Sequence, residues 1–534
     1  MNENLPFIWW KNYRNEAASP EKVAEMTHEK ARQAGMRFHA AESASAESDS
    51  LMRCERALEA VLTNRGNPSR DVDRVLAGDP QFIFGHCLRA AIVVRADDIA
   101  ARSKLAASVA TLEAICPDIG DPARRHAAAA RAWLDGDQAL AVERYGAIVI
   151  DWPCDILALV VAHALDFRLG QRRMLCDRVA EVLPEWEAAF PGYASVLAMY
   201  AFGLEENGQY RRAEKIARRA LALDPRHPGA IHVIAHVMEM QGRAREGLEF
   251  LAATESAWMD TTSISVHLAW HRALFHLDAD DPASALAVYD AQIAKTHAPE
   301  MSELADASAL LWRLHLRNIR VGKRWQVLAD SWEMQTLTDV RPFYIVHAMM
   351  AFAAAGRDAA ARRMFSDLSQ VETRGASTLY AESALIRPLC KALLAFAYGD
   401  YASCVELLVH VRHIAHRCGG SLAQCDLVHL TVTEAALRAQ GESRPGASQG
   451  AHRTETDEPV QSAASATPGF IIHHGASYWA ITPFAQLYSR AAICPLLRSL
   501  LGVKPSAVVH SIRSVLLSAK PAVCYLPRRS RAVW

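Results

Sequence analysis

From residue 71 onward, hydrophobic and polar positions follow a helical period, and short breaks interrupt the pattern. Between Asp71 and Asp98, an Asp-Pro pair at positions 79 and 80 breaks one helix and an amphipathic helix follows. Before residue 71, the pattern predicts helices over 21–36 and 51–62, with a connection over 41–50. Alanine is abundant and runs of β-branched residues are few, which favours helices packed on helices. The pattern therefore predicts an all-α chain.

The stretch from Tyr193 to Leu277 shows most clearly how these helices pair. Small, aromatic and helix-ending residues stand at the positions that define a helix–turn–helix unit of the tetratricopeptide type. They are Gly208, Tyr210, Ala213, Ala217, Ala220 and Pro225.

Such units recur along the chain. In each, a glycine or aspartate is predicted to end the first helix of a hairpin, and the turn residues are spaced 34, 38, 34, 38, 42, 34 and 43 positions apart. One hairpin cannot cover its own apolar face, so we predict a stacked α-solenoid of about eight irregular hairpins forming a superhelix with a concave groove. The predicted turn residues are Gly136, Gly170, Gly208, Gly242, Asp280, Gly322, Gly356 and Gly399, and small residues for close helix packing follow five positions later at Ala141, Ala213, Gly247, Ala285 and Ala361.

Composition divides the chain into an N-terminal helical segment (1–70), the solenoid (71–440), a disordered linker (441–469) and a tail (470–534). The formal net charge is −1, and no nucleic-acid partner is expected. The 11 cysteines include no Cys-x-x-Cys pair, which is typical of reduced thiols. Neither a secretory signal nor an apolar run long enough for a membrane span is visible. A cytoplasmic protein is predicted.

The tail differs sharply from the rest of the chain. No acidic residue follows Glu458, whereas eight basic residues do, so the tail carries +8 and the remainder −9. A basic, apolar tail is suited to contact with an anionic membrane or partner, and membrane contact is expected only there. A change of reading frame near residue 440 is the alternative explanation, because it would also remove the acidic residues and the repeat pattern together.

Five blocks within 71–440 resemble the tetratricopeptide repeat protein 38 family. They read FGHCLRA, AFGLEENGQYRRAE, HVIAHVMEMQGRAREGLEFL, HLAWHRALFHL and DASALLWRL, in that order. The resemblance implies an all-helical solenoid with irregular repeats. It implies no particular reaction.

Two His-x-x-x-His pairs are the main candidates for chemistry. His232 and His236 lie one turn apart on one predicted helix, and His267 and His271 do so on the next. Imidazoles at this spacing can reach one divalent ion such as zinc or manganese. Glu239 lies on the same helix face as His232 and His236, so it is a candidate third ligand or general base, and it is the predicted catalytic residue. The candidate metal ligands are His232, His236, His267, His271 and Asp306.

The same residues fall at positions that face the groove in tetratricopeptide repeats. Three functions remain open: a groove that binds a peptide, protein or small ligand; a metal-dependent hydrolase; and a scaffold whose groove its own chain fills. Val233 stands where a zincin helix carries its catalytic glutamate, and phosphate-loop, dinucleotide-binding and nucleophile-elbow motifs are absent. The predicted groove residues are Glu205, His232, His236, Glu239, His267, Trp270, His271, Trp312, Arg313 and His347.

Overall fold

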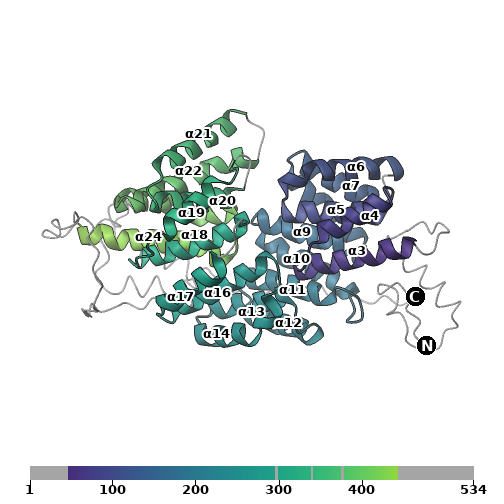
Figure 1. The fold of residues 1–534 in the computed structure, drawn as a ribbon, viewed down its shortest axis with the longest axis horizontal. Helices are drawn as coiled ribbons and strands as arrows, with labels where there is room; N and C mark the ends of the chain where they lie inside the picture. The colour runs from purple at the N-terminus through teal and green to yellow at the C-terminus, as the bar shows by residue number, and fades with distance from the viewer. Residues whose placement is uncertain (1–45, 119, 295–298, 338–340, 375–377, 443–534) are drawn as a thin grey trace, which may run out of the picture. The chain divides into compact units, whose positions relative to one another are not determined.

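The computed structural model describes residues 46–118, 120–294, 299–337, 341–374 and 378–442 (Figure 1). These ranges contain 22 α-helices and no strand, so the predicted all-α class is confirmed. The predicted helix over 21–36 and the tail lie outside them, as does the linker apart from residues 441 and 442, which belong to the last helix. The helix predicted over 51–62 begins earlier, at Ala46, so part of the expected connection is helical.

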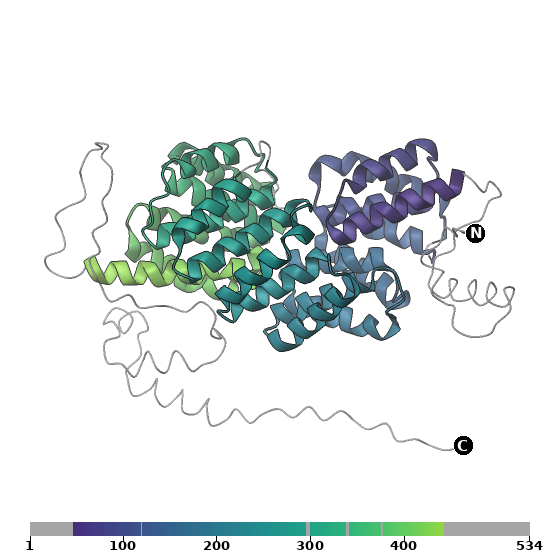
Figure 2. The ribbon, with the colours of Figure 1, turned by 60° about the horizontal axis from the view of Figure 1, so that its bottom comes forward.

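Most helices form hairpins that follow one another along the chain, and the leading helices of most successive hairpins pack on each other (Figure 1). The last helix, α24 (Leu422–Glu442), packs against α18 and α23 (Figure 2). The hairpins are α3/α4 (Ala46–Thr63, Pro68–Gly78), α5/α6 (Ile83–Ala96, Arg102–Ile115), α7/α8 (Pro122–Leu134, Gln138–Asp151), α9/α10 (Ile156–Arg168, Arg172–Val182), α11/α12 (Tyr193–Glu206, Tyr210–Leu223), α13/α14 (Pro228–Met240, Ala244–Ala253), α16/α17 (Ser263–Asp278, Pro282–Val288), α18/α19 (Met301–Leu316, Arg324–Glu333), α20/α21 (Pro342–Ala354, Asp358–Arg374) and α22/α23 (Thr378–Ala397, Tyr401–Val411). The short helix α15 (Glu255–Trp258) follows α14.

The turn inside each hairpin is made by one residue in the left-handed backbone region, where glycine, asparagine and aspartate are favoured. Seven of the eight predicted turn residues occupy this position, and Gly208, with φ at 72°, shows the pattern. Gly322 differs in its place: it also has a positive φ, at 60°, but it lies in the connection before α19, whereas α18 ends at Leu316 and Asn318, at φ 56°, makes the turn. The spacing of 42 residues between Asp280 and Gly322 therefore becomes 38 between Asp280 and Asn318.

That correction changes two predicted side-chain positions. The predicted groove positions of Trp312 and Arg313 depend on Gly322 as the turn residue of that repeat, because each position in a repeat is numbered from its turn residue. Counting from Asn318 moves both four positions along the repeat, about one helical turn. The error arose because asparagine ends this helix where glycine or aspartate was expected.

Close helix packing at the small residues is confirmed. Ala141, Ala213 and Ala285 are fully buried. Gly247 lies against the ring of Phe275, where an added Cβ would come within 2.4 Å of the ring. The three alanines are buried as the prediction requires, whereas Gly247 accommodates a ring from α16, the leading helix of the next hairpin.

The buried side chains form two apolar cores, one built from residues 54–230 and the other from residues 176–435. Tyr200, Ile216 and Leu221 pack against both. No helix in the described ranges combines the length and apolarity that crossing a bilayer requires.

Candidate metal centre

Helices α13 and α16 pack together and bring the four predicted histidines into one group. Their ring centroids are separated by 4.3 Å to 6.3 Å. Each ring offers one nitrogen such that all four nitrogens lie within 4.8 Å of one another. We call this group, His232, His236, His267 and His271, the histidine cluster.

The helical period explains the convergence. Residues four apart lie on one face of a helix, and α13 and α16 turn their histidine faces toward each other. His236 and His271 are fully buried, whereas His232 and His267 are half-buried. The cluster therefore sits within the helical packing, with its more accessible side at His232 and His267.

Two carboxylates orient members of the cluster. His267 Nδ1 lies 2.8 Å from Asp306 Oδ2, and His271 Nδ1 lies 2.5 Å from Glu239 Oε2. A carboxylate that accepts the Nδ1 proton fixes the tautomer and leaves Nε2 with its lone pair, the arrangement common around protein-bound metals. Both carboxylates thus support the histidines from outside the group of four nitrogens. The structure places Asp306 beside the cluster and gives Glu239 a positioning contact.

Burial favours the neutral form of three of the four imidazoles. Burial lowers the pKa of His236 to about 3, mainly by desolvating its charged form, with a smaller opposing effect from Glu206. Burial likewise lowers the pKa of His232 and of His271 well below its usual value, and neighbouring histidines add to the effect. Neutral imidazole is the metal-ligating form.

A second group adjoins the cluster and shares His236 with it. Glu205 and Glu206, the last two residues of α11, can each offer an oxygen within 4.8 Å of a His236 nitrogen, and we call them the carboxylate pair. His236 Nδ1 lies 3.3 Å from Glu205 Oε2. Burial raises the pKa of Glu205 and of Glu206 to about 8, and for Glu206 the charge of Glu205 adds to the effect.

Glu206 was not among the predicted site residues, although the sequence contained a signal. Two adjacent carboxylates in the last turn of a buried helix oppose the helix dipole, which favours cations there. In the structure, Arg172 Nε lies 3.3 Å from Glu206 Oε2, and the Leu422 amide donates to Glu206 Oε1 at 3.1 Å. These contacts partly offset the charge of Glu206.

The start of α24 lies against both groups. Besides the bond from the Leu422 backbone, the Gln424 side chain donates from Nε2 to Asp306 Oδ1 at 3.2 Å, and Arg313 donates to the Ala423 carbonyl at 2.6 Å. Leu422, Ala423 and Gln424 were not predicted, because no local pattern links them to helices more than 100 positions earlier.

The other predicted groove residues are packed rather than open. Trp270 is fully buried and stacks on His267, with ring centroids 5.2 Å apart. Trp312 is also fully buried, and its indole N–H donates to Thr431 of α24 at 3.0 Å. His347 is buried and donates from Nδ1 to the Phe343 carbonyl at 2.7 Å.

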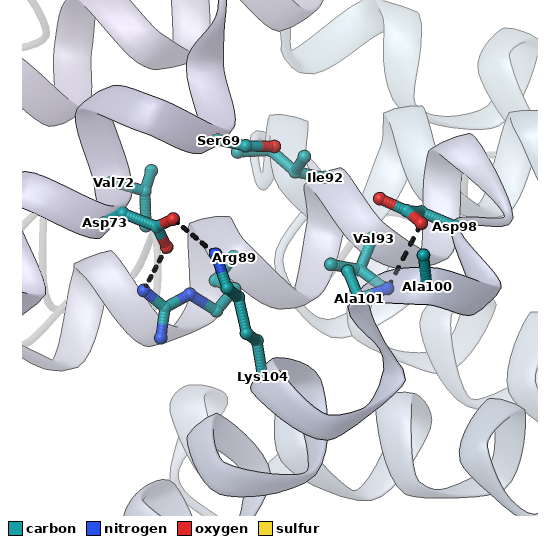
Figure 3. Close-up of a pocket in the computed structure, with 10 residues that line it drawn as sticks. All are labelled: Ser69, Val72, Asp73, Arg89, Ile92, Val93, Asp98, Ala100, Ala101 and Lys104. Atoms are coloured by element: carbon teal, nitrogen blue, oxygen red, sulfur yellow. Dashed lines mark hydrogen bonds and ion pairs between the residues drawn. The ribbon is translucent and has the colours of Figure 1, made fainter.

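A cavity of about 240 Å³ lies elsewhere, among α4, α5 and the start of α6 (Figure 3). The charged side chains that line this cavity are bonded to one another or to the backbone. Asp73 binds both Arg89, at 2.7 Å, and Lys104, at 2.6 Å, and Asp98 accepts a bond from the Ala101 amide (Figure 3). The cavity has no residue in common with the histidine cluster or the carboxylate pair.

Fold and site together define an all-helical, repeat-like protein with a buried group of histidines and glutamates that could hold a metal ion. No protein-family model matches the chain.

Proposed function

We propose that this protein is a metalloprotein whose histidine cluster binds one divalent first-row transition-metal ion, zinc before manganese. The single observation that carries the proposal is the convergence of four imidazoles, three of which have buried ring nitrogens without a hydrogen-bond partner. His232 Nε2, His271 Nε2 and both nitrogens of His236 lack a hydrogen-bond partner. Imidazole ligands suit zinc, copper, iron and nickel better than they suit the harder manganese ion.

Packing alone gives a poorer account of these side chains. A buried polar atom without a partner costs about 1–3 kcal/mol, and most buried polar atoms in proteins are paired. His86 shows a fully paired buried histidine, since its Nδ1 bonds to Ser108 and its Nε2 to the Pro80 carbonyl. His126 and His347 each leave one ring nitrogen unpaired, but only the cluster gathers several such nitrogens in one place among the described residues. A bound ion would satisfy the cluster in the way that hydrogen bonds satisfy His86.

The groove is proposed to be filled by the protein's own chain. If the hairpins form the tetratricopeptide-like superhelix that the family resemblance implies, α24 occupies the face that would otherwise receive a peptide. Its bonds to Trp312, Arg313 and Asp306 support this arrangement. An open peptide-binding groove is less well supported, because Trp270, Trp312 and Arg313 are buried.

Four imidazoles would complete a tetrahedral shell, and closed shells are typical of metal sites without a bound substrate. Glu239, the predicted general base, is engaged with His271. The proposal for the cluster is therefore metal binding. Hydrolysis would require an open coordination position that this set of ligands does not supply.

Metal analysis of the purified full-length protein tests the proposal. We expect at least one tightly bound zinc per chain after dialysis against zinc and then buffer. His232→Ala should release the ion of the cluster and lower zinc affinity by at least tenfold while the helical circular dichroism spectrum is retained. His86→Ala, which removes a buried histidine with both nitrogens paired, is the matched control and should keep its zinc. Equal zinc content in all three proteins, or none in the wild type, would contradict the proposal.

A further inference from the structure

His236 belongs to two groups of metal-ligating side chains at once. One is the histidine cluster and the other is formed with Glu205 and Glu206. Its Nδ1 lies 3.3 Å from Glu205 Oε2, and its second nitrogen, Nε2, is the one that we assign to the cluster. Neither nitrogen has a hydrogen-bond partner, and the side chain is fully buried.

The carboxylate pair is equally unusual. Glu205 is fully buried and both of its oxygens lack a hydrogen-bond partner. Glu206 is 3% exposed, and its contacts are the ion pair with Arg172 and the bond from the Leu422 amide. One arginine thus faces two buried carboxylates, while an unpaired histidine nitrogen is aimed at the same point. Two carboxylates and an imidazole are a ligand set for a divalent cation.

We infer that the carboxylate pair and His236 bind a second divalent metal ion, and that the His236 ring bridges it to the ion of the histidine cluster. When both ions bind, the His236 imidazole releases its remaining proton to solvent, and the resulting imidazolate donates one lone pair from each nitrogen, so one ring serves two ions. The second site has three protein ligands, two of them carboxylates, and is therefore suited to harder ions such as manganese as well as to zinc.

The bridge explains why both nitrogens of a buried ring are unpaired. In a protein with one ion at the cluster, His236 Nδ1 would keep a proton and need an acceptor with hydrogen-bond geometry, as His267 and His271 have. The inference rests on the proposed function for its first ion but makes a separate claim about the number of ions and their coupling.

Copper(II) is the probe, because electron paramagnetic resonance reports both the number of bound ions and their coupling. The full-length protein is stripped with a chelator, loaded with copper(II) and freed of excess. We expect two copper ions per chain by elemental analysis and a spin intensity far below two, since an imidazolate bridge couples the two spins antiparallel. Glu205→Gln combined with Glu206→Gln should bind one copper with full spin intensity.

The matched control is Asp166→Asn, which changes a fully buried carboxylate bonded to Arg178 and outside both groups. It should keep two coupled ions. Thermal unfolding of each apoprotein checks that the variants fold, and His232→Ala, which spares the second site, supplies an independent variant expected to retain one copper.

Each other outcome has a definite meaning. One copper in both the wild type and the glutamine variant overturns the second site and leaves the first. Two copper ions with full spin intensity overturn the bridge. No bound copper in the wild type overturns the proposed function itself.

Discussion

His236 is the residue on which the proposed chemistry depends. Burial lowers the pKa of its ring to about 3, so the ring is neutral at physiological pH. It lies between three other imidazoles and two carboxyl groups. A neutral, buried ring without hydrogen bonds is unfavourable unless something else uses its lone pairs.

In the proposed centre, Asp306 acts through His267, the ring that its carboxylate contacts. Its carboxylate holds the His267 Nδ1 proton and accepts a bond from Gln424. Asp306→Asn keeps the shape but weakens this support, so zinc affinity should fall by about tenfold, at the lower end of the 10–100-fold range for such partners. Competition with a chromophoric chelator measures the affinity.

Asp281→Asn is the control for that measurement. Asp281 caps α17 by accepting a bond from the Ser284 amide, and asparagine caps helices equally well. Its zinc affinity should equal that of the wild type. An unchanged affinity in Asp306→Asn would show that the His267 contact does not support metal binding.

At the scale of elements, the register between α13 and α16 decides whether the histidines meet. That register depends on close approach within and between hairpins. Gly247 on α14 faces Phe275 on α16, and α14 packs against both α13 and α16. A small residue at position 247 therefore helps to determine how closely α16 packs against α14.

Gly247→Ala should lower the free energy of unfolding by about 1–3 kcal/mol, the usual cost of overpacking a core. The added Cβ would fall within 2.4 Å of a fully buried ring that has little room to move. Chemical denaturation measures the change. Gly78→Ala, at the end of α4, meets nothing within 4 Å and should be neutral or stabilising, because alanine has the higher helix propensity. Equal stability of the two variants would contradict this account of the packing.

Much of the arrangement of helices within hairpins could be predicted from the sequence. Turn residues such as Gly208 and Gly242 follow from a local conformational requirement, and the histidine faces follow from a period of four. Asn318 was missed because asparagine also adopts the left-handed conformation, and Gly322 nearby was the more conspicuous residue. The local rule was correct, but it did not choose between two candidates.

At the scale of the whole described chain, contacts between distant segments complete the site. Leu422 and Gln424 reach residues of α11 and α18 across 216 and 118 positions. Asn64 accepts a bond from the Thr262 amide, and Asp97 pairs with Arg341 at 3.5 Å. No periodic pattern predicts such contacts, since they depend on how the complete array of helices packs. The sequence therefore predicted the histidines but not the helix start that lies against them.

The central claim is that the histidine cluster is a metal centre, and X-ray absorption at the zinc edge tests it most directly. The sample is the Glu205→Gln, Glu206→Gln protein loaded with zinc, so that only the cluster is occupied. The account predicts a first shell of nitrogen at about 2.0–2.1 Å together with the outer-shell scattering of several imidazoles. Sulfur in the first shell, or light atoms without imidazole scattering, would contradict it.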